Sequence, residues 1–350
     1  MKRYQIVELT NESNHAGTKA TLDISLIAER LGFKKLDLRM RTSEDGYIAK
    51  IERQMGYLVD WSGCYSKINK NSVVLLQHPF HYPQLIRNKC LCDLKKKKNV
   101  KFISVIHDVE KLRGFRYNEY YKKEFQVMLD IADVMIVHND VMKKFFIEYG
   151  VPEEKLVVLN IFDYLQSDTE SDKKIFFEKS ITIAGNLDTE KCKYLVQLEK
   201  LKDLNINLYG PNYNPKMKNI ENIHYQGSLP VNEIPKYLDR GFGLVWDGNS
   251  INGCCGQAGE YLRYNNPHKL SLYLSSGIPV IIWKKAAEAE FVRNNNLGIL
   301  VDKLDELENI LGQLDKEKYE EMCNSVKKIA ERLKKGYYGE HALLKALERL

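Results

Sequence analysis

The chain has 350 residues, of which 44% are hydrophobic, and its 53 basic and 47 acidic residues give a formal net charge of +6. This length predicts about two domains with sizeable cores, and the composition excludes a disordered or fibrous protein. A small, interspersed positive charge does not require a nucleic-acid partner, so an anionic small molecule is a sufficient ligand.

The cysteine pattern predicts free thiols. The seven cysteines form no C-x-x-C pair and show no repeated metal-ligand spacing, so we expect no metal site. Free thiols are typical of a reducing compartment. The apolar run after the basic start is too short for a signal peptide, and no stretch approaches the roughly 20 apolar residues of a membrane span. We therefore expect a cytoplasmic protein with at most peripheral membrane association.

The first half of the chain alternates apolar strands with helix-periodic segments. We expect strands at 4–9, 36–40, 72–78, 101–106, 133–137 and 157–162, and helices at 18–31, 48–58, 85–98, 117–131 and 141–148. The polar loop Asn11–Ala20 joins the first strand to the first helix, where an open α/β sheet presents ligands, but it lacks a full glycine fingerprint. Lys95–Lys98 predicts a solvated helix end, with attraction to an anionic membrane surface as the less favoured alternative.

His107 and Asp108 directly follow the apolar strand 101–106. Residues just past the carboxyl ends of parallel strands are the usual place for chemistry in such sheets. We therefore select both as candidates for an acid–base or positioning role, the alternative being a hydrogen-bonded structural pair.

The alternation of strands and helices restarts in the second half. Gln166–Lys174 is polar and aperiodic and is the predicted linker between residues 1–164 and 165–330. Strands are expected at 180–184, 206–210, 224–226 and 243–246, with helices near 194–201 and 231–238, and two charged helices at 304–350. Two such runs indicate two doubly wound parallel-sheet domains facing each other across a cleft. The glycine-rich segment Asp247–Gly259 is interpreted as a flexible loop that could close over a ligand, or as a surface excursion.

A capped helix and a strand are expected at 264–283. Asn266 is predicted as the N-cap and Pro267 as the first helical residue, while Gly277 and Pro279 end the helix. His268 and Lys269 fall in the first turn, where backbone N–H groups and the helix dipole favour an anion. The segment predicts a diphosphate site, the alternative being a surface helix whose Lys269 points into water.

These motifs together resemble those of bacterial sugar-nucleotide glycosyltransferases, typified by β-1,6-galactofuranosyltransferases and the glucosyltransferases of serine-rich-repeat adhesins. The resemblance rests on these segments: Ala184-Gly185-Asn186-Leu187, Tyr209-Gly210, Trp246-Asp247-Gly248, Asn265–Leu270, Gly277–Ile281, Ala16-Gly17-Thr18, His107-Asp108, and the stretch from His138-Asn139 to Phe162-Asp163-Tyr164. The Asn-Asn-Pro-His-Lys segment is the most specific of them.

The resemblance implies a GT-B fold of two Rossmann-like domains, with the last helix, about 331–350, returning to the first domain. It implies a homo-oligomer that transfers a hexosyl unit, without metal or cofactor, from a nucleoside diphosphate sugar, expected to be UDP-linked, to a glycan or glycoprotein acceptor in cell-surface glycan assembly. The donor-binding residues are then Gly17, Thr18, Asn186, Tyr209, Gly210, Trp246, Asn266, Pro267, His268, Lys269 and Leu270, and the catalytic candidates His107 and Asp108. The alternatives are a sugar-nucleotide epimerase and a non-catalytic sugar-nucleotide sensor on the same scaffold. An NAD-dependent dehydrogenase is disfavoured because the complete glycine fingerprint is missing.

Overall fold

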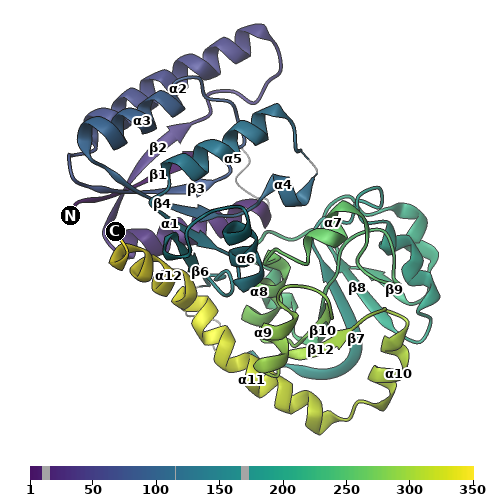
Figure 1. Ribbon diagram of the computed structural model, residues 1–350. Helices are drawn as coiled ribbons and strands as arrows, with labels where there is room; N and C mark the ends of the chain where they lie inside the picture. Colours follow the sequence, from purple (N-terminus) through teal and green to yellow (C-terminus); the bar gives the residue numbers. More distant parts are fainter. Residues whose placement is uncertain (10–15, 115, 167–172) are drawn as a thin grey trace. The chain divides into compact units, whose positions relative to one another are not determined.

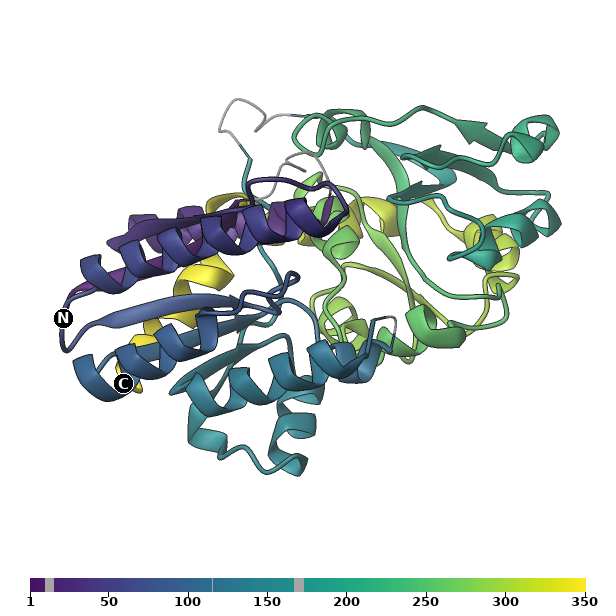
Figure 2. The same ribbon diagram turned by 90° about the horizontal axis from the view of Figure 1, so that it is seen from above.

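The computed structural model describes residues 1–9, 16–114, 116–166 and 173–350. Contacts divide the chain into unit 1, Met1–Leu159 with Gly339–Leu350, and unit 2, Asn160–Tyr338. In Figures 1 and 2, helices flank the sheet of each unit. The sequence placed the boundary at 164/165; most of the predicted linker, 167–172, lies outside the described residues.

Unit 1 contains a six-stranded parallel sheet in the order β2-β1-β3-β4-β5-β6. Its elements are β1 (Arg3–Leu9), α1 (Ala16–Arg30), β2 (Phe33–Arg39), α2 (Tyr47–Lys67), β3 (Val73–His78), α3 (Arg87–Lys98), β4 (Lys101–Ile106), α4 (Glu110–Arg113), α5 (Glu119–Ile131), β5 (Val134–Val137), α6 (Asp140–Glu148), η1 (Glu153–Lys155) and β6 (Leu156–Val158). The predicted helix at 48–58 is too short, because α2 continues for a further nine residues, to Lys67.

Strand alternation assigns the helices of unit 1 to faces of its sheet. Gln5 and Gln77 donate to the carbonyl oxygens of Ser25 and Thr21, both on α1. Side chains at even positions of β1, such as Ile6, share a core cluster with α2 and α3. α1 therefore covers the face opposite to α2 and α3. The chain end also belongs to this unit, where Arg349 Nη1 donates to the carbonyl of Leu156 at 2.7 Å.

Unit 2 contains a second six-stranded parallel sheet in the order β12-β11-β10-β7-β8-β9. Its elements are β7 (Phe176–Ala184), η3 (Lys193–Lys200), β8 (Asn205–Tyr209), η4 (Pro215–Asn219), β9 (Ile223–Tyr225), η5 (Ile234–Tyr237), β10 (Arg240–Val245), α7 (Gly256–Tyr261), α8 (His268–Ser275), β11 (Val280–Trp283), α9 (Ala289–Asn294), β12 (Gly298–Val301), α10 (Glu306–Gln313) and α11 (Lys316–Lys335). The last helix of the chain is α12 (Tyr337–Glu348). The tail thus has three helices where two were predicted, and the segments predicted as helices near 194–201 and 231–238 contain 3₁₀ turns.

Candidate active site

The strand order of unit 2 reverses between β7 and β10. From β7 the chain adds β8 and β9 on one side, and it then returns to add β10, β11 and β12 on the other. Ligands of open α/β sheets bind outside the carboxyl ends of the strands at such a reversal. Gly185 follows β7 at this point, and Trp246 and Asp247 follow β10.

The first turn of α8 brings Lys269 to this point of the sheet. Its Nζ donates to the carbonyl oxygen of Trp246 at 2.8 Å and to Oδ2 of Asp247 at 2.9 Å. Burial alone would lower the pKa of the Lys269 ammonium, but the Asp247 carboxylate raises that pKa above its usual value. Lys269 is therefore a cation, and it is partly neutralised by a carboxylate rather than extended into water.

The start of α8 differs from the predicted cap. Pro267, not Asn266, is the N-cap residue, and no side chain caps the helix. The Asn266 amide instead donates to the carbonyl oxygen of Asn160 at 2.9 Å, and Ser271 Oγ donates to that of Phe162 at 2.6 Å. The His268 ring stacks on Tyr164, with centroids 5.1 Å apart. Segment 160–164 thus fixes the helix start, so Asn266 acts as an anchor of α8 rather than as its cap.

Two glycines bring the ends of β7 and β8 together. Gly210 has a φ of +143°, and a Cβ added to it would lie 1.8 Å from the carbonyl oxygen of Gly185. Only glycine permits this approach of the two backbones. Asn186, directly after Gly185, accepts from the Asn212 amide at 2.9 Å, and Tyr209 is half-buried. Backbone groups and one polar side chain are thereby grouped at the switch point.

The side chains of Trp246 and Leu270, both predicted to bind the donor, are fully buried. The Trp246 indole N–H donates to the carbonyl oxygen of Ser250 at 3.0 Å. These two residues can therefore offer only backbone groups to a ligand. The sequence pattern could not separate such core positions from exposed ones.

The glycine-rich segment after β10 packs on the rest of unit 2. Ile251 and Cys254 are buried within it. Leu304 N donates to the carbonyl oxygen of Ile251 at 2.8 Å, and Asn249 N donates to that of Cys255 at 3.0 Å. Apolar burial and these hydrogen bonds hold the loop against unit 2.

His107 and Asp108 lie past the end of β4 in unit 1, and both are half-buried. His107 Nε2 is 2.7 Å from Oε1 of Gln77, whose amide nitrogen donates to the carbonyl oxygen of Thr21. With this amide orientation, a neutral imidazole carries its proton on Nε2 and its lone pair on Nδ1. Asp108 Oδ2 accepts from Arg113 at 2.7 Å. The pair therefore combines an imidazole acceptor with a carboxylate held by a guanidinium.

Gly17 and Thr18 fall in the first turn of α1, which begins at Ala16. The carbonyl oxygen of Thr18 accepts from the Thr21 hydroxyl at 2.8 Å. Residues 11–15 of the predicted ligand loop lie outside the described residues.

One acidic residue at the switch point of unit 1 was missed by the sequence analysis. Glu8 is near the end of β1 and accepts a hydrogen bond from the Gln84 amide, whose oxygen accepts from the Trp61 indole at 2.7 Å. Burial raises the pKa of Glu8 to about 7; Arg87 lowers this pKa and Glu124 raises it. A carboxylate ending an apolar strand was the signal available in the sequence. Its environment, however, comes from residues far along the chain.

Stability should fall as the pH rises from 4.5 to 7 because of Glu8. In this window the unfolded chain releases the proton of Glu8, whereas the folded chain retains it, so deprotonation favours unfolding. Glu8→Gln should remove this loss, on the order of 3 kcal/mol in the free energy of unfolding. Urea unfolding of both proteins at a series of pH values measures the difference.

Two buried histidines change the stability in the opposite direction to Glu8. Burial lowers the pKa of His78 to about 3 and that of His138 to about 4, so their contribution to stability is lost as the pH falls below 6.5. Wild type and Glu8→Gln both retain these histidines, so the histidine contributions to the free energy of unfolding cancel in the comparison. Parallel pH profiles for wild type and Glu8→Gln would contradict the assignment to Glu8.

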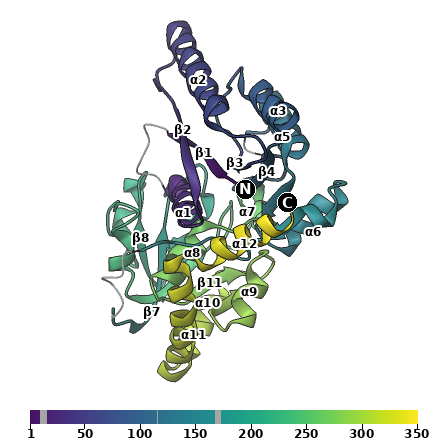
Figure 3. The ribbon, with the colours of Figure 1, turned by 90° about the vertical axis from the view of Figure 1, so that its left-hand side faces the viewer.

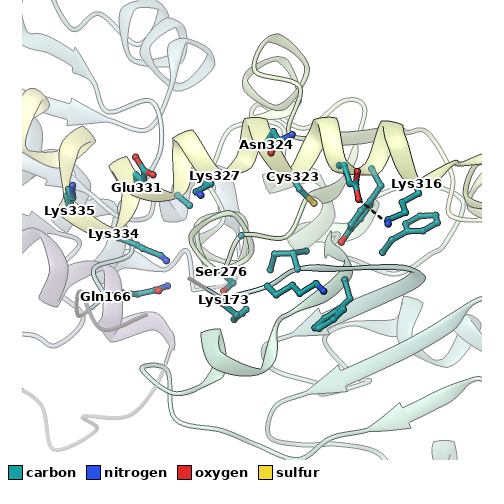
Figure 4. Close-up of a pocket in the computed structure, with 18 residues that line it drawn as sticks. Gln166, Lys173, Ser276, Lys316, Cys323, Asn324, Lys327, Glu331, Lys334 and Lys335 are labelled. Carbon is teal, nitrogen blue, oxygen red and sulfur yellow. Dashed lines mark ion pairs between the residues drawn. The ribbon is translucent and has the colours of Figure 1, made fainter. Parts of the chain in front are cut away.

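A cavity of about 1120 Å³ lies elsewhere in unit 2 (Figure 4). It is lined by α11 and the start of β7, with Lys327 and Cys323 on the helix side. Lys316 on its wall pairs with Glu320 at 3.4 Å. Lys269 and Asp247 are not among its lining residues, so this cavity is separate from the switch-point site. Within the described ranges, no group of three or more His, Cys, Asp and Glu residues could hold a metal ion.

Family sequence models match both halves of the chain. Residues 3–161 match the glucosyltransferase 3-like N-terminal domain, and residues 181–346 match the glucosyltransferase 3-like C-terminal domain. The β-1,6-galactofuranosyltransferase WbbI of Escherichia coli (strain K12) is 34% identical over 253 residues, which cover 71% of this chain and 72% of WbbI. The chain belongs to the glucosyltransferase 3-like family. It is therefore a glycosyltransferase, and the predicted resemblance is confirmed.

Two further comparisons cover almost the whole chain. Glucosyltransferase 3 of Streptococcus gordonii is 27% identical over 346 residues, covering 97% of this chain and 98% of that protein. The structure of Alr3699/HepE from Anabaena in complex with UDP aligns with a TM-score of 0.63 at 13% identity, covering 99% of this chain and all of that one. Together with the two parallel sheets, this likeness confirms the predicted two-domain α/β GT-B fold.

Proposed function

We propose that this glycosyltransferase moves a glucosyl, galactosyl or galactofuranosyl unit from a UDP-sugar to a glycan or glycoprotein acceptor during cell-surface glycan assembly. The observation that carries the proposal is Lys269, a cation in the first turn of α8, at the carboxyl end of β10 where the strand order reverses. Departure of a nucleoside diphosphate requires that its developing charge be stabilised. A helix start with an ammonium supplies that stabilisation.

The donor diphosphate is assigned to the first turn of α8, with Lys269 as its cation. A Cβ added to Gly185 would meet no described atom within 4 Å, so there is space for the nucleoside beside Gly185, where Asn186 and Tyr209 offer polar groups. The complex of HepE with UDP and the names of WbbI and glucosyltransferase 3 support the choice of donor class and the range of sugars.

We propose that His107 Nδ1 receives the proton of the acceptor hydroxyl, with Asp108 as a second candidate.

We further propose a cytoplasmic homo-oligomer. The seven thiols, all free, agree with a reducing compartment. The described residues contain no helix long and apolar enough to cross a membrane.

The proposal is tested by thermal shift with UDP- and GDP-sugars, followed by transfer assays with the sugar that binds. A ligand at about 100 times its Kd should stabilise the fold by roughly 2.7 kcal/mol. Transfer of label to an acceptor supports the proposal. Inversion of a stereocentre in the donor sugar, without transfer, would identify an epimerase. Binding alone would identify a sensor.

Transfer should persist in EDTA, because the proposed site neutralises the leaving diphosphate with Lys269 and backbone N–H groups rather than with a metal. The initial rate is compared with and without EDTA, and then after addition of manganese or magnesium. Activity that EDTA abolishes and a divalent ion restores would refute metal-independent transfer.

A further inference from the structure

Helix α2 presents an uninterrupted apolar strip to solvent. The strip consists of Tyr47, Ile48, Ile51, Met55, Leu58 and Val59. At 100° per residue these positions fall within one arc of about a third of the helix circumference. Ile48 is 81% exposed and Val59 63% exposed, while the buried face of the same helix is formed by residues such as Tyr57 and Trp61. A surface helix ordinarily turns charged residues outward, so this strip is a candidate contact surface.

The strip extends beyond α2. Leu85, which is 84% exposed, is held beside the helix because its backbone N–H donates to Oε1 of Gln54 at 3.0 Å. Farther along, a groove of about 180 Å³ separates α2 from α3. Its lining includes Tyr65, Ile86 and Lys89. The two helices lie side by side in Figures 1 and 3. Apolar surface therefore runs from α2 to the start of α3.

Basic residues border this apolar surface on α3. At its surface the helix carries Lys89 and Lys95–Lys98 against one acidic residue, Asp93, whereas Arg87 is buried and paired with Glu124. Lys98 Nζ lies 4.3 Å from the ring centroid of Tyr65, at the end of α2. Lys89 and Lys96 are exposed. The charge beside the strip is therefore positive, which complements an anionic partner.

We propose that the α2 strip and the α3 lysines dock unit 1 on an anionic lipid bilayer. Aliphatic side chains can enter the boundary between headgroups and acyl chains, while lysines stay at headgroup level. A second copy of the chain fits less well, because a two-fold contact over this face would bring two lysine-rich helices close together. The strip is mostly aliphatic, and Tyr47 is its one member of the Trp, Tyr and Arg set that is typical of protein interfaces.

Cosedimentation of the full chain with phosphatidylcholine vesicles, with and without phosphatidylglycerol, tests the proposal. The wild type should bind the anionic vesicles and release them as salt increases. Ile48→Ser with Met55→Ser should lower the partition coefficient at least about tenfold. Lys89→Gln with Lys96→Gln should lower it by roughly fivefold or more, and only on anionic vesicles.

Val141→Ser on α6 is the matched control, since Val141 is an exposed aliphatic residue of the same unit but lies outside the strip. It should bind vesicles as the wild type does, and all variants should keep wild-type melting and UDP affinity. Absence of vesicle binding in the wild type, or equal loss in the control, overturns the proposal. So does a serine variant that binds vesicles normally but dissociates an oligomer, since the strip would then bind a second copy.

Discussion

His107→Ala should lower the transfer rate about 10²–10⁴-fold while changing UDP affinity no more than about twofold. Its imidazole is proposed to receive the acceptor proton, and that interaction matures only in the transition state. In the neutral ring the Gln77 amide oxygen holds the proton on Nε2, so the nitrogen proposed as the base is Nδ1. The measurements are melting temperature, UDP affinity and initial transfer rate on the same preparation.

Two further variants separate catalysis from structure. Asp108→Asn removes the carboxylate charge held by Arg113 and identifies which member of the pair receives the proton. His341→Ala, on α12, replaces an exposed histidine of the same unit and should transfer at the wild-type rate. If His107→Ala and Asp108→Asn both retain near-normal rates, the pair has no catalytic role. A loss of melting temperature, affinity and rate together would identify a structural role instead.

Lys269→Ala should weaken UDP binding by roughly 10- to 150-fold, because removing a charge-assisted contact to phosphate costs about 1.5–3 kcal/mol. Some loss of stability should accompany it, since Asp247 loses its cation and the carbonyl oxygen of Trp246 loses its donor. Calorimetry gives the affinity, and urea unfolding gives the stability of the same protein.

Asp247→Asn distinguishes the two roles of the lysine. If Lys269 meets the diphosphate, removing the neighbouring negative charge should preserve or increase UDP affinity. If Lys269 serves only to hold Asp247, both substitutions should weaken binding alike, and the assignment would be rejected. Lys284→Ala is the control, because Lys284 follows the neighbouring strand β11 and is also ion-paired, at 3.2 Å to Asp302.

The sequence determined the fold class and several site segments by itself. Apolar strands that alternate with amphipathic helices can bury both sheet faces only in a layered α/β domain, so two parallel sheets could be predicted. Strand ends are also local features, and His107, Gly185 and Asp247 were located by them. The prediction for α2 was too short because apolar residues on both faces of this helix obscure the helical period.

Only the tertiary structure decided the electrostatics of the site. The partner of Lys269 is Asp247, 22 residues earlier, and the carboxylate of Glu8 meets an amide 76 residues away. The N-cap of α8 also differs from the predicted one, because the Asn266 amide donates to Asn160, which is 106 positions away in the chain. Burial and ion pairing depend on which segments pack together, and periodicity and residue propensity carry no information about that packing. The sequence therefore located the residues of the candidate site, whereas folding determined their charges and partners.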